Sequence, residues 1–85
     1  MEKIFIKEEI NSSLEFNDSA LDFLEKINKK EDKYIEVDFT GIIFISRSFA
    51  QAYFFNKNKL NKTIIEVNVP ENIKFMLDMI RSKFE

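Results

Sequence analysis

Residues 37–50 read VDFTGIIFISRSFA and combine the signals of a strand, a turn and a helix. The alternating polar and apolar residues of 34–39 have the two-residue period of a half-buried strand. A Thr-Gly pair then breaks the strand, because glycine tolerates the positive φ that many turns require. An apolar connector, 42–45, follows. A serine at 46 or 48 opens a helix, since serine is among the best N-capping residues.

The rest of the chain repeats this order of strand and helix. Alternation marks the other strands, and apolar residues three and four positions apart mark the helices. The expected strands are 3–7, 34–39 and 63–69, with a loop over 11–16. The expected helices run from Asp18 or Ser19 to about Lys30, from Ser46 or Ser48 into 56–59, and from Pro70 to Phe84. The last helix carries an apolar stripe of Ile73, Met76, Leu77, Ile80 and Phe84, widened by Phe75 and Met79.

The strand pattern predicts a sheet with one apolar and one polar face. The apolar face would comprise Ile4, Ile6, Ile35, Val37, Phe39, Ile65, Val67 and Val69. A parallel sheet covered on both faces has near-continuous apolar strands instead. We therefore expect an α/β fold of β-α-β-α-β-α order, a two-layer sandwich with a mostly parallel sheet of three to four strands and helices mainly on one face. Right-handed crossovers on a single face favour strands in sequential order.

Length and composition exclude several function classes. The 85 residues suit a single domain, 1–85, because independent cores rarely split below roughly 100–150 residues. Without Cys or His, and with a single Gly, the chain lacks thiol chemistry, the commonest general base and a Gly-rich phosphate loop. A net charge of −2 gives no bulk attraction to nucleic acid, and no apolar run approaches the ~20 residues of a membrane span. We expect a soluble, cytoplasmic protein with no cofactor, no metal, and neither nucleic acid nor membrane as partner.

The order of residues in 37–50 resembles the STAS domains of sulfate transporters and anti-sigma-factor antagonists. Their signature reads roughly apolar-Asp-apolar-Ser-Gly-Val-x-Phe-Ile-Asp-Ser-Ser-Gly. The stretch is more similar to a bacterial and archaeal STAS-like family of unknown function, whose motif reads roughly Asp-Phe-x-Gly-Val-x-x-Ile-Ser-x-Ser-Phe-Ala. Asp38 and Gly41 match the strand-end acid and the turn glycine without change. The resemblance is tight over about fourteen residues and implies a STAS-like domain.

The resemblance also implies a regulatory site. In anti-sigma-factor antagonists a partner kinase phosphorylates the second serine of the signature, which switches binding off. Ser48 falls on that serine, whereas Ser46, Arg47 and Phe49 replace the acid, the first serine and the glycine around it. Ser48 is therefore the predicted phosphoacceptor. The predicted partner-binding loop and helix start comprise Asp38, Thr40, Gly41, Ser46, Arg47, Ser48 and Phe49.

Each of these residues also has a purely structural interpretation. Ser46 is explained by N-capping alone, and Ser48 by capping or by a solvent-facing place in the first helical turn. Asp38 is explained as an acid at a strand end that accepts N–H bonds from the following loop. Gly41 is explained by a turn with positive φ.

Two classes of function follow. The first is a non-enzymatic regulatory module that binds a protein partner, a kinase-like protein or an anti-sigma-type ATPase. The alternative is a structural, homo-oligomerisation domain without a phospho-switch, which would bury the open sheet face around Phe5 and Tyr34 or the aromatic residues near Phe55.

An enzyme is a third class and is not expected. Glu36 and Asp38 alternate on one strand face, but the sequence offers nothing to bury them and so separate their pKa values. A sandwich of this size is also not expected to hold a deep pocket.

Overall fold

The central sheet consists of three parallel strands in the order β1-β3-β5. The strands are β1 (Glu2–Phe5), β3 (Tyr34–Asp38) and β5 (Thr63–Val67). This computed structural model describes residues 2–84, except for the side chain of Phe84. The sequential strand order is the one expected from right-handed crossovers on a single face.

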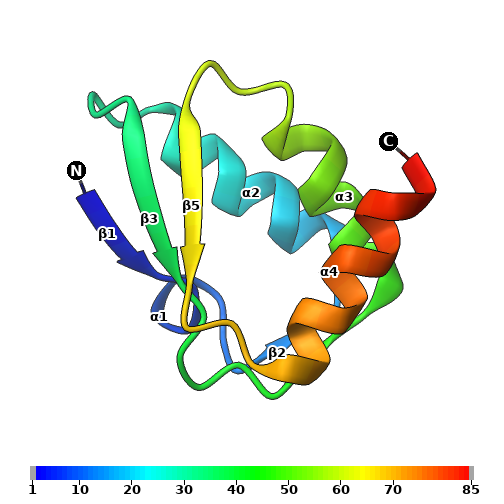
Figure 1. Cartoon of the computed structure of the whole chain (residues 1–85). Coiled ribbons are helices and arrows are strands. Elements are labelled where there is room, and N and C mark those ends of the chain that lie inside the picture. Colours follow the sequence, from blue (N-terminus) through cyan, green and yellow to red (C-terminus); the bar gives the residue numbers. More distant parts are fainter. Residues whose placement is uncertain (1, 85) are drawn as a thin grey trace.

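The long helices form a second layer on one face of this sheet (Figure 1). The layer comprises α2 (Asn17–Asn28), α3 (Arg47–Lys57) and α4 (Glu71–Phe84). Helix α3 packs against both α2 and α4, and no helix within residues 2–84 covers the other face of the sheet. The predicted α/β sandwich with a parallel sheet is thus confirmed. No helix in the described part of the chain has the length and apolarity needed to cross a membrane.

Apolar side chains from both layers form one core. Near its middle, the Tyr53 ring meets Phe39 edge-on at a centroid distance of 6.2 Å and stacks on Phe49 at 6.2 Å. Such aromatic pairs contribute about 0.5–1.5 kcal/mol beyond the burial of their area. All three rings are fully buried, so they join the end of β3 to the first half of α3.

The chain before α2 departs from the expected long strand and loop. β1 ends at Phe5, and α1 (Ile6–Glu9) forms a single turn in which the Ile10 N–H donates to the Ile6 carbonyl at 3.0 Å. The expected loop contains β2 (Ser13–Leu14), which pairs in parallel with β4 (Phe44–Ile45). The alternation of polar and apolar residues in 3–7 fits a five-residue strand and also a shorter strand followed by a helical turn. It could not distinguish them, because Ile6 is buried in either case.

Helix α2 also starts earlier than predicted. Its N-cap residue is Phe16, which makes no side-chain cap bond, rather than Asp18 or Ser19. The Ser19 N–H instead donates to the Phe16 carbonyl at 3.1 Å. Capping propensity did not decide this boundary, since Phe16 has the extended backbone of an N-cap residue (φ −107°, ψ 137°) and helical geometry begins at the next residue.

The prediction for the faces of β5 was wrong. Ile64 pairs with Ile35, and Glu66 pairs with Val37, so Ile64 and Glu66 face the helices. Ile65 and Val67 were expected on that face and lie on the open one. Because Ile64 and Ile65 are adjacent, the sequence could not show which of them faces the helices. Glu66 can face the helices because it finds polar partners there.

The apolar stripe of α4 is narrower than expected. Ile73 and Ile80 are fully buried, and Met76 and Leu77 pack partly buried against the core. Phe75, expected to widen the stripe, is 72% exposed. Two helical steps of about 100° each turn it away from the side of Ile73. The predicted contact of the Phe84 side chain lies outside the described residues.

Candidate functional site

The chain leaves β3 through a tight turn at the carboxyl edge of the sheet. The Ile42 N–H donates to the Phe39 carbonyl at 3.1 Å, and Gly41 has a φ of 83°. A Cβ atom at this glycine would lie 2.8 Å from Cδ of Lys7. The predicted glycine turn is therefore confirmed, and its positive φ favours glycine, whereas the flexible Lys7 side chain could move aside.

The Asp38 carboxylate is the polar centre of this edge, and we call its set of bonds the Asp38 clamp. Oδ1 accepts the Thr40 backbone N–H at 2.8 Å and the Thr40 hydroxyl at 2.5 Å. Oδ2 accepts the Asn68 side-chain amide at 2.9 Å and lies 3.1 Å from Nζ of Lys3. The clamp thus joins β1, the end of β3 and the residue that follows β5. The expectation that Asp38 accepts loop N–H bonds is confirmed.

The expectation that nothing buries Asp38 was wrong. The side chain lies on the sheet face without helices, yet Asp38 is only 1% exposed because Lys3, Thr40 and Asn68 enclose it. Burial alone would raise the pKa of Asp38, but the hydrogen bonds from Thr40, Asn68 and Lys3 outweigh it and hold that pKa well below its ordinary value. The carboxylate is therefore ionised in the folded state at neutral pH. The bond to Asp38 in turn raises the pKa of Lys3.

The four apolar residues after the turn do not all enter the core. Ile42 and Ile45 are buried, whereas Ile43 is 70% and Phe44 47% exposed. Backbone bonds hold this arrangement, since the Ile43 N–H donates to the Ser12 carbonyl at 2.9 Å. On the other side, the Asn72 side-chain amide donates to the Ile43 carbonyl at 3.2 Å. The two outer side chains are thus presented on a segment that is fixed from both sides.

The start of α3 is capped as predicted. Ser46 is the N-cap residue, and its hydroxyl accepts the Phe49 N–H at 3.0 Å and donates to the Glu15 carbonyl at 2.6 Å. Arg47 and Ser48 follow in the first turn and are exposed. Ser48 therefore lies beside first-turn N–H groups and the positive end of the helix dipole.

The predicted site residues fall on two connected segments, the turn after β3 and the start of α3. Thr40, Gly41, Arg47 and Ser48 are exposed on them. Asp38 and Phe49 are buried, so they support these segments from within.

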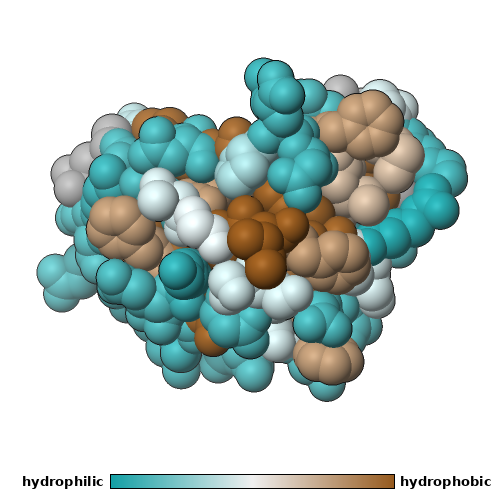
Figure 2. All heavy atoms as spheres, turned by 90° about the horizontal axis from the view of Figure 1, so that it is seen from below, coloured by the Kyte–Doolittle hydropathy of each residue, from teal (hydrophilic) through white to brown (hydrophobic). Residues whose placement is uncertain are grey.

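Sequence reasoning missed the exposed apolar side chains near the turn after β3. Figure 2, which views the molecule from the lower end of Figure 1, shows apolar side chains gathered at the centre of this face. Four exposed large residues belong to segments that meet here, and we call them the apolar end surface: Phe16, Ile43, Phe44 and Phe75. The available signal was the run 42–45, which holds more apolar side chains than a short connector can bury.

The site has no evident metal-binding group. Within residues 2–84, no three Asp or Glu side chains gather in a way that could hold a metal ion. Both oxygens of the ionised Asp38 already accept hydrogen bonds from protein donors.

Comparison with known proteins assigns no family. No family model, no curated protein and no solved structure matches the chain. The STAS-like resemblance therefore stays a prediction from residues 37–50.

Replacing Asp38 by Asn will flatten the acid dependence of stability. A carboxyl group whose folded pKa is lowered stabilises the fold above its unfolded pKa of about 3.9, and this stability is lost as the pH falls towards the folded pKa. Urea unfolding between about pH 6 and pH 2.5 should show the wild type losing stability more steeply than Asp38→Asn. At neutral pH the variant should be less stable by about 1–3 kcal/mol. The exposed Asp22→Asn is the control, and parallel wild-type and Asp38→Asn curves would contradict the clamp.

Alanine substitutions at the two serines will separate capping from exposure. Ser46→Ala removes the bond to the Phe49 N–H and should lower the free energy of unfolding by about 0.5–2 kcal/mol. Ser48→Ala removes an exposed hydroxyl and should change it by less than about 0.5 kcal/mol. Urea denaturation of both variants checks this, and equal losses would show that the capping role is not confined to Ser46.

Proposed function

We propose that this chain is a non-enzymatic regulatory module that binds a protein partner at the carboxyl end of its sheet. The observation that carries the proposal is the outward position of Ile43 and Phe44 on a segment held by hydrogen bonds on both sides. Contiguous exposed apolar patches on small soluble domains are typical of interaction sites. Phe16, which follows β2, and Phe75 of α4 are also exposed, and both β2 and α4 are hydrogen-bonded to this segment.

The proposed switch is phosphorylation of Ser48. This hydroxyl is exposed in the first turn of α3, where a phosphate would accept first-turn N–H groups and interact favourably with the helix dipole. A phosphate adds a charge of about −1.5 to −2. We place the start of α3 within the docking surface, so that charge would have to be desolvated when a partner docks and would weaken binding. Arg47, also exposed, is placed to pair with a phosphate or with a partner's carboxylate.

The resemblance to anti-sigma-factor antagonists suggests the class of partner. It points to a kinase-like protein or an anti-sigma-type ATPase, which would both bind the surface and modify Ser48. Residues 37–50, which carry this resemblance, include the exposed Ile43, Phe44 and Ser48. The proposal thus joins a motif to a surface of suitable chemistry.

Partner capture with charge variants tests this function. Wild type, Ser48→Ala and Ser48→Asp would each be immobilised and exposed to extract of the native host. We expect wild type and Ser48→Ala to retain a common partner that Ser48→Asp loses, because Asp places a charge at the docking surface. Ile43→Asp should lose the same partner by direct disruption of the apolar contact.

The matched control is Ser82→Asp, which makes the same chemical change at an exposed serine of α4. It should retain the partner. Identical partner profiles for wild type, Ser48→Asp and Ile43→Asp would reject both the switch and the surface. The intact mass of the protein isolated from its host provides an independent readout, because a phosphate adds a defined increment.

Self-association is the second candidate function, and the open face of the sheet favours it. Phe5, Tyr34 and Ile65 are 38%, 51% and 37% exposed on the face that carries no helix. Small domains commonly gain stability by burying such a face in an oligomer.

Sedimentation at micromolar and nanomolar concentration distinguishes the two candidates. A dimer at micromolar concentration that becomes a monomer in Ile65→Lys, and is unaffected by Ser48→Asp, would support association through the sheet. A monomer at both concentrations would reject it.

A further inference from the structure

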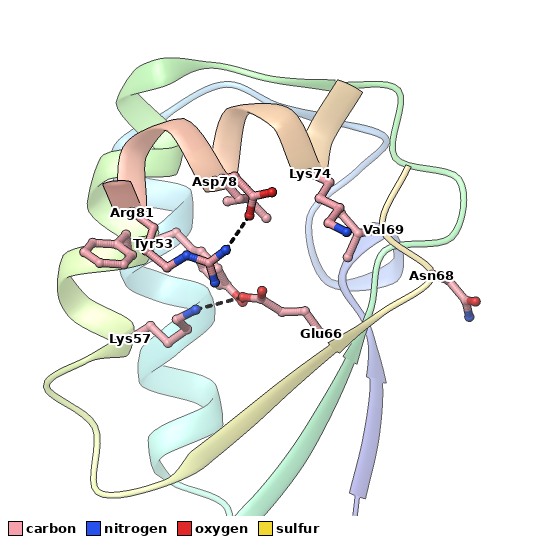
Figure 3. Close-up of a pocket in the computed structure, with 10 residues that line it drawn as sticks. Tyr53, Lys57, Glu66, Asn68, Val69, Lys74, Asp78 and Arg81 are labelled. Atoms are coloured by element: carbon pink, nitrogen blue, oxygen red, sulfur yellow. Dashed lines mark hydrogen bonds and ion pairs between the residues drawn. The ribbon is translucent and has the colours of Figure 1, made fainter. Parts of the chain in front are cut away.

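A hollow of about 330 Å³ lies between α3, β5 and α4, and none of the residues of the apolar end surface lines it. Figure 3 shows Tyr53 and Lys57 on one side of it, Lys74 and Arg81 on the α4 side, and Glu66 reaching in from β5. The volume is at the lower end of the roughly 300–1,000 Å³ range of small-molecule pockets. It was not anticipated from the sequence, which predicted the opposite phase for β5.

The wall on the β5 side is built around the Glu66 carboxylate. Its Oε2 accepts the Tyr53 hydroxyl at 2.6 Å and lies 3.0 Å from Nζ of Lys57. Burial, and then the Glu66 charge, raise the pKa of Tyr53, so its hydroxyl stays protonated and donates. The Lys57 ammonium also lies 5.2 Å from the centroid of the Tyr53 ring. These contacts fix the direction of the carboxylate, while Oε1 makes no hydrogen bond or ion pair within residues 2–84.

The hollow is lined by three cationic and two anionic side chains, so one cation has no anionic partner in the lining. Lys57 pairs with Glu66, and Arg81 pairs with Asp78 at 2.6 Å. Lys74 also lines the hollow, but it makes no side-chain hydrogen bond or ion pair with any other residue in the described range. The lining therefore carries a net charge of about +1, and an anion would neutralise it.

Apolar side chains complete the lining. Phe54 of α3, Leu77 of α4 and Val69, which follows β5, all contribute to it. Each is partly buried against the core, so each offers remaining apolar area to a bound molecule. The hollow also lies beside the carboxyl end of a parallel strand, where open α/β sheets commonly bind ligands. The Asn68 side chain takes no part, because it turns away to Asp38 (Figure 3).

We propose that this hollow binds a small organic anion, a carboxylate or phosphate monoester with a compact apolar body. The anionic group would contact Lys74 and the outer side of the Arg81 guanidinium, and the apolar body would pack against Phe54 and Leu77. The site is independent of the function proposed above and lies on a different part of the molecule.

An NMR titration of the ¹⁵N-labelled protein tests the site with four probes: phenyl phosphate, benzoate, inorganic phosphate and phenol. We expect the two organic anions to shift the amide signals of the lining residues, and each to bind more tightly than inorganic phosphate or phenol. Tighter binding of phenyl phosphate assigns the phosphate class, and tighter binding of benzoate assigns the carboxylate class. If inorganic phosphate binds as tightly as phenyl phosphate, the apolar wall makes no contribution and the assignment of an organic anion is overturned.

Two substitutions of opposite sign make the test specific. Lys74→Gln removes the unpaired cation and should weaken binding of the organic anions about tenfold. Glu66→Gln keeps an acceptor for Tyr53 but removes a negative charge, and should strengthen binding severalfold. Lys83→Gln, which removes a charge from an exposed position on the same helix, is the control and should leave affinity unchanged.

The outcomes that overturn the site are distinct. No lining shifts at millimolar probe, or an equal loss of affinity in Lys74→Gln and Lys83→Gln, would show that the hollow does not recognise an anion. Because Lys74 is exposed, its variant should fold normally, and a wild-type far-UV circular dichroism spectrum would verify this. The test therefore stands even if Glu66→Gln is unstable.

Discussion

A single buried carboxylate, that of Asp38, joins β1, the end of β3 and the residue that follows β5. Burial of an ionised group costs several kcal/mol unless donors compensate it. Here the compensation comes from three places in the chain: Lys3 on β1, Thr40 after β3 and Asn68 after β5. The buried charge is tolerated only if all three donors stay in position. The Asp38 clamp therefore couples the register of the sheet to the paths of the loops that follow β3 and β5.

Both proposed surfaces depend on those paths. After Thr40 the chain buries Ile42 and Ile45 and leaves Ile43 and Phe44 outside, and this leads to the capped start of α3. After β5, Asn68 adopts a φ of 53°, a conformation that Asn tolerates better than most residues, and so directs the chain towards α4. The hollow lies along this second path, between α4 and β5, the strand that Asn68 follows.

The extent of successful prediction follows from how local each signal is. The turn at Gly41 and the cap at Ser46 could be predicted, because dihedral preference and side-chain capping act over a few residues. The parallel sheet could be predicted because a helix connects each pair of successive expected strands. The burial of Asp38 could not, since Lys3 and Asn68 lie far from it in sequence. The sequence also could not show which side chains of β5 face the helices, because Glu66 is tolerated on that side only through its bonds to α3.

Amide hydrogen exchange in wild type and Asp38→Asn measures most directly whether the Asp38 clamp holds the segment 40–46, which leads into α3. The N–H groups of Thr40, Ile43 and Ser46 bond to Asp38, Ser12 and Leu14, so all three should exchange slowly in the wild type. The Ile27 amide of α2 reports the loss of global stability, and in Asp38→Asn the three amides should be accelerated at least about tenfold more than Ile27. Unchanged rates at these three amides, or an acceleration no greater than that of Ile27, would contradict a local organising role for this carboxylate.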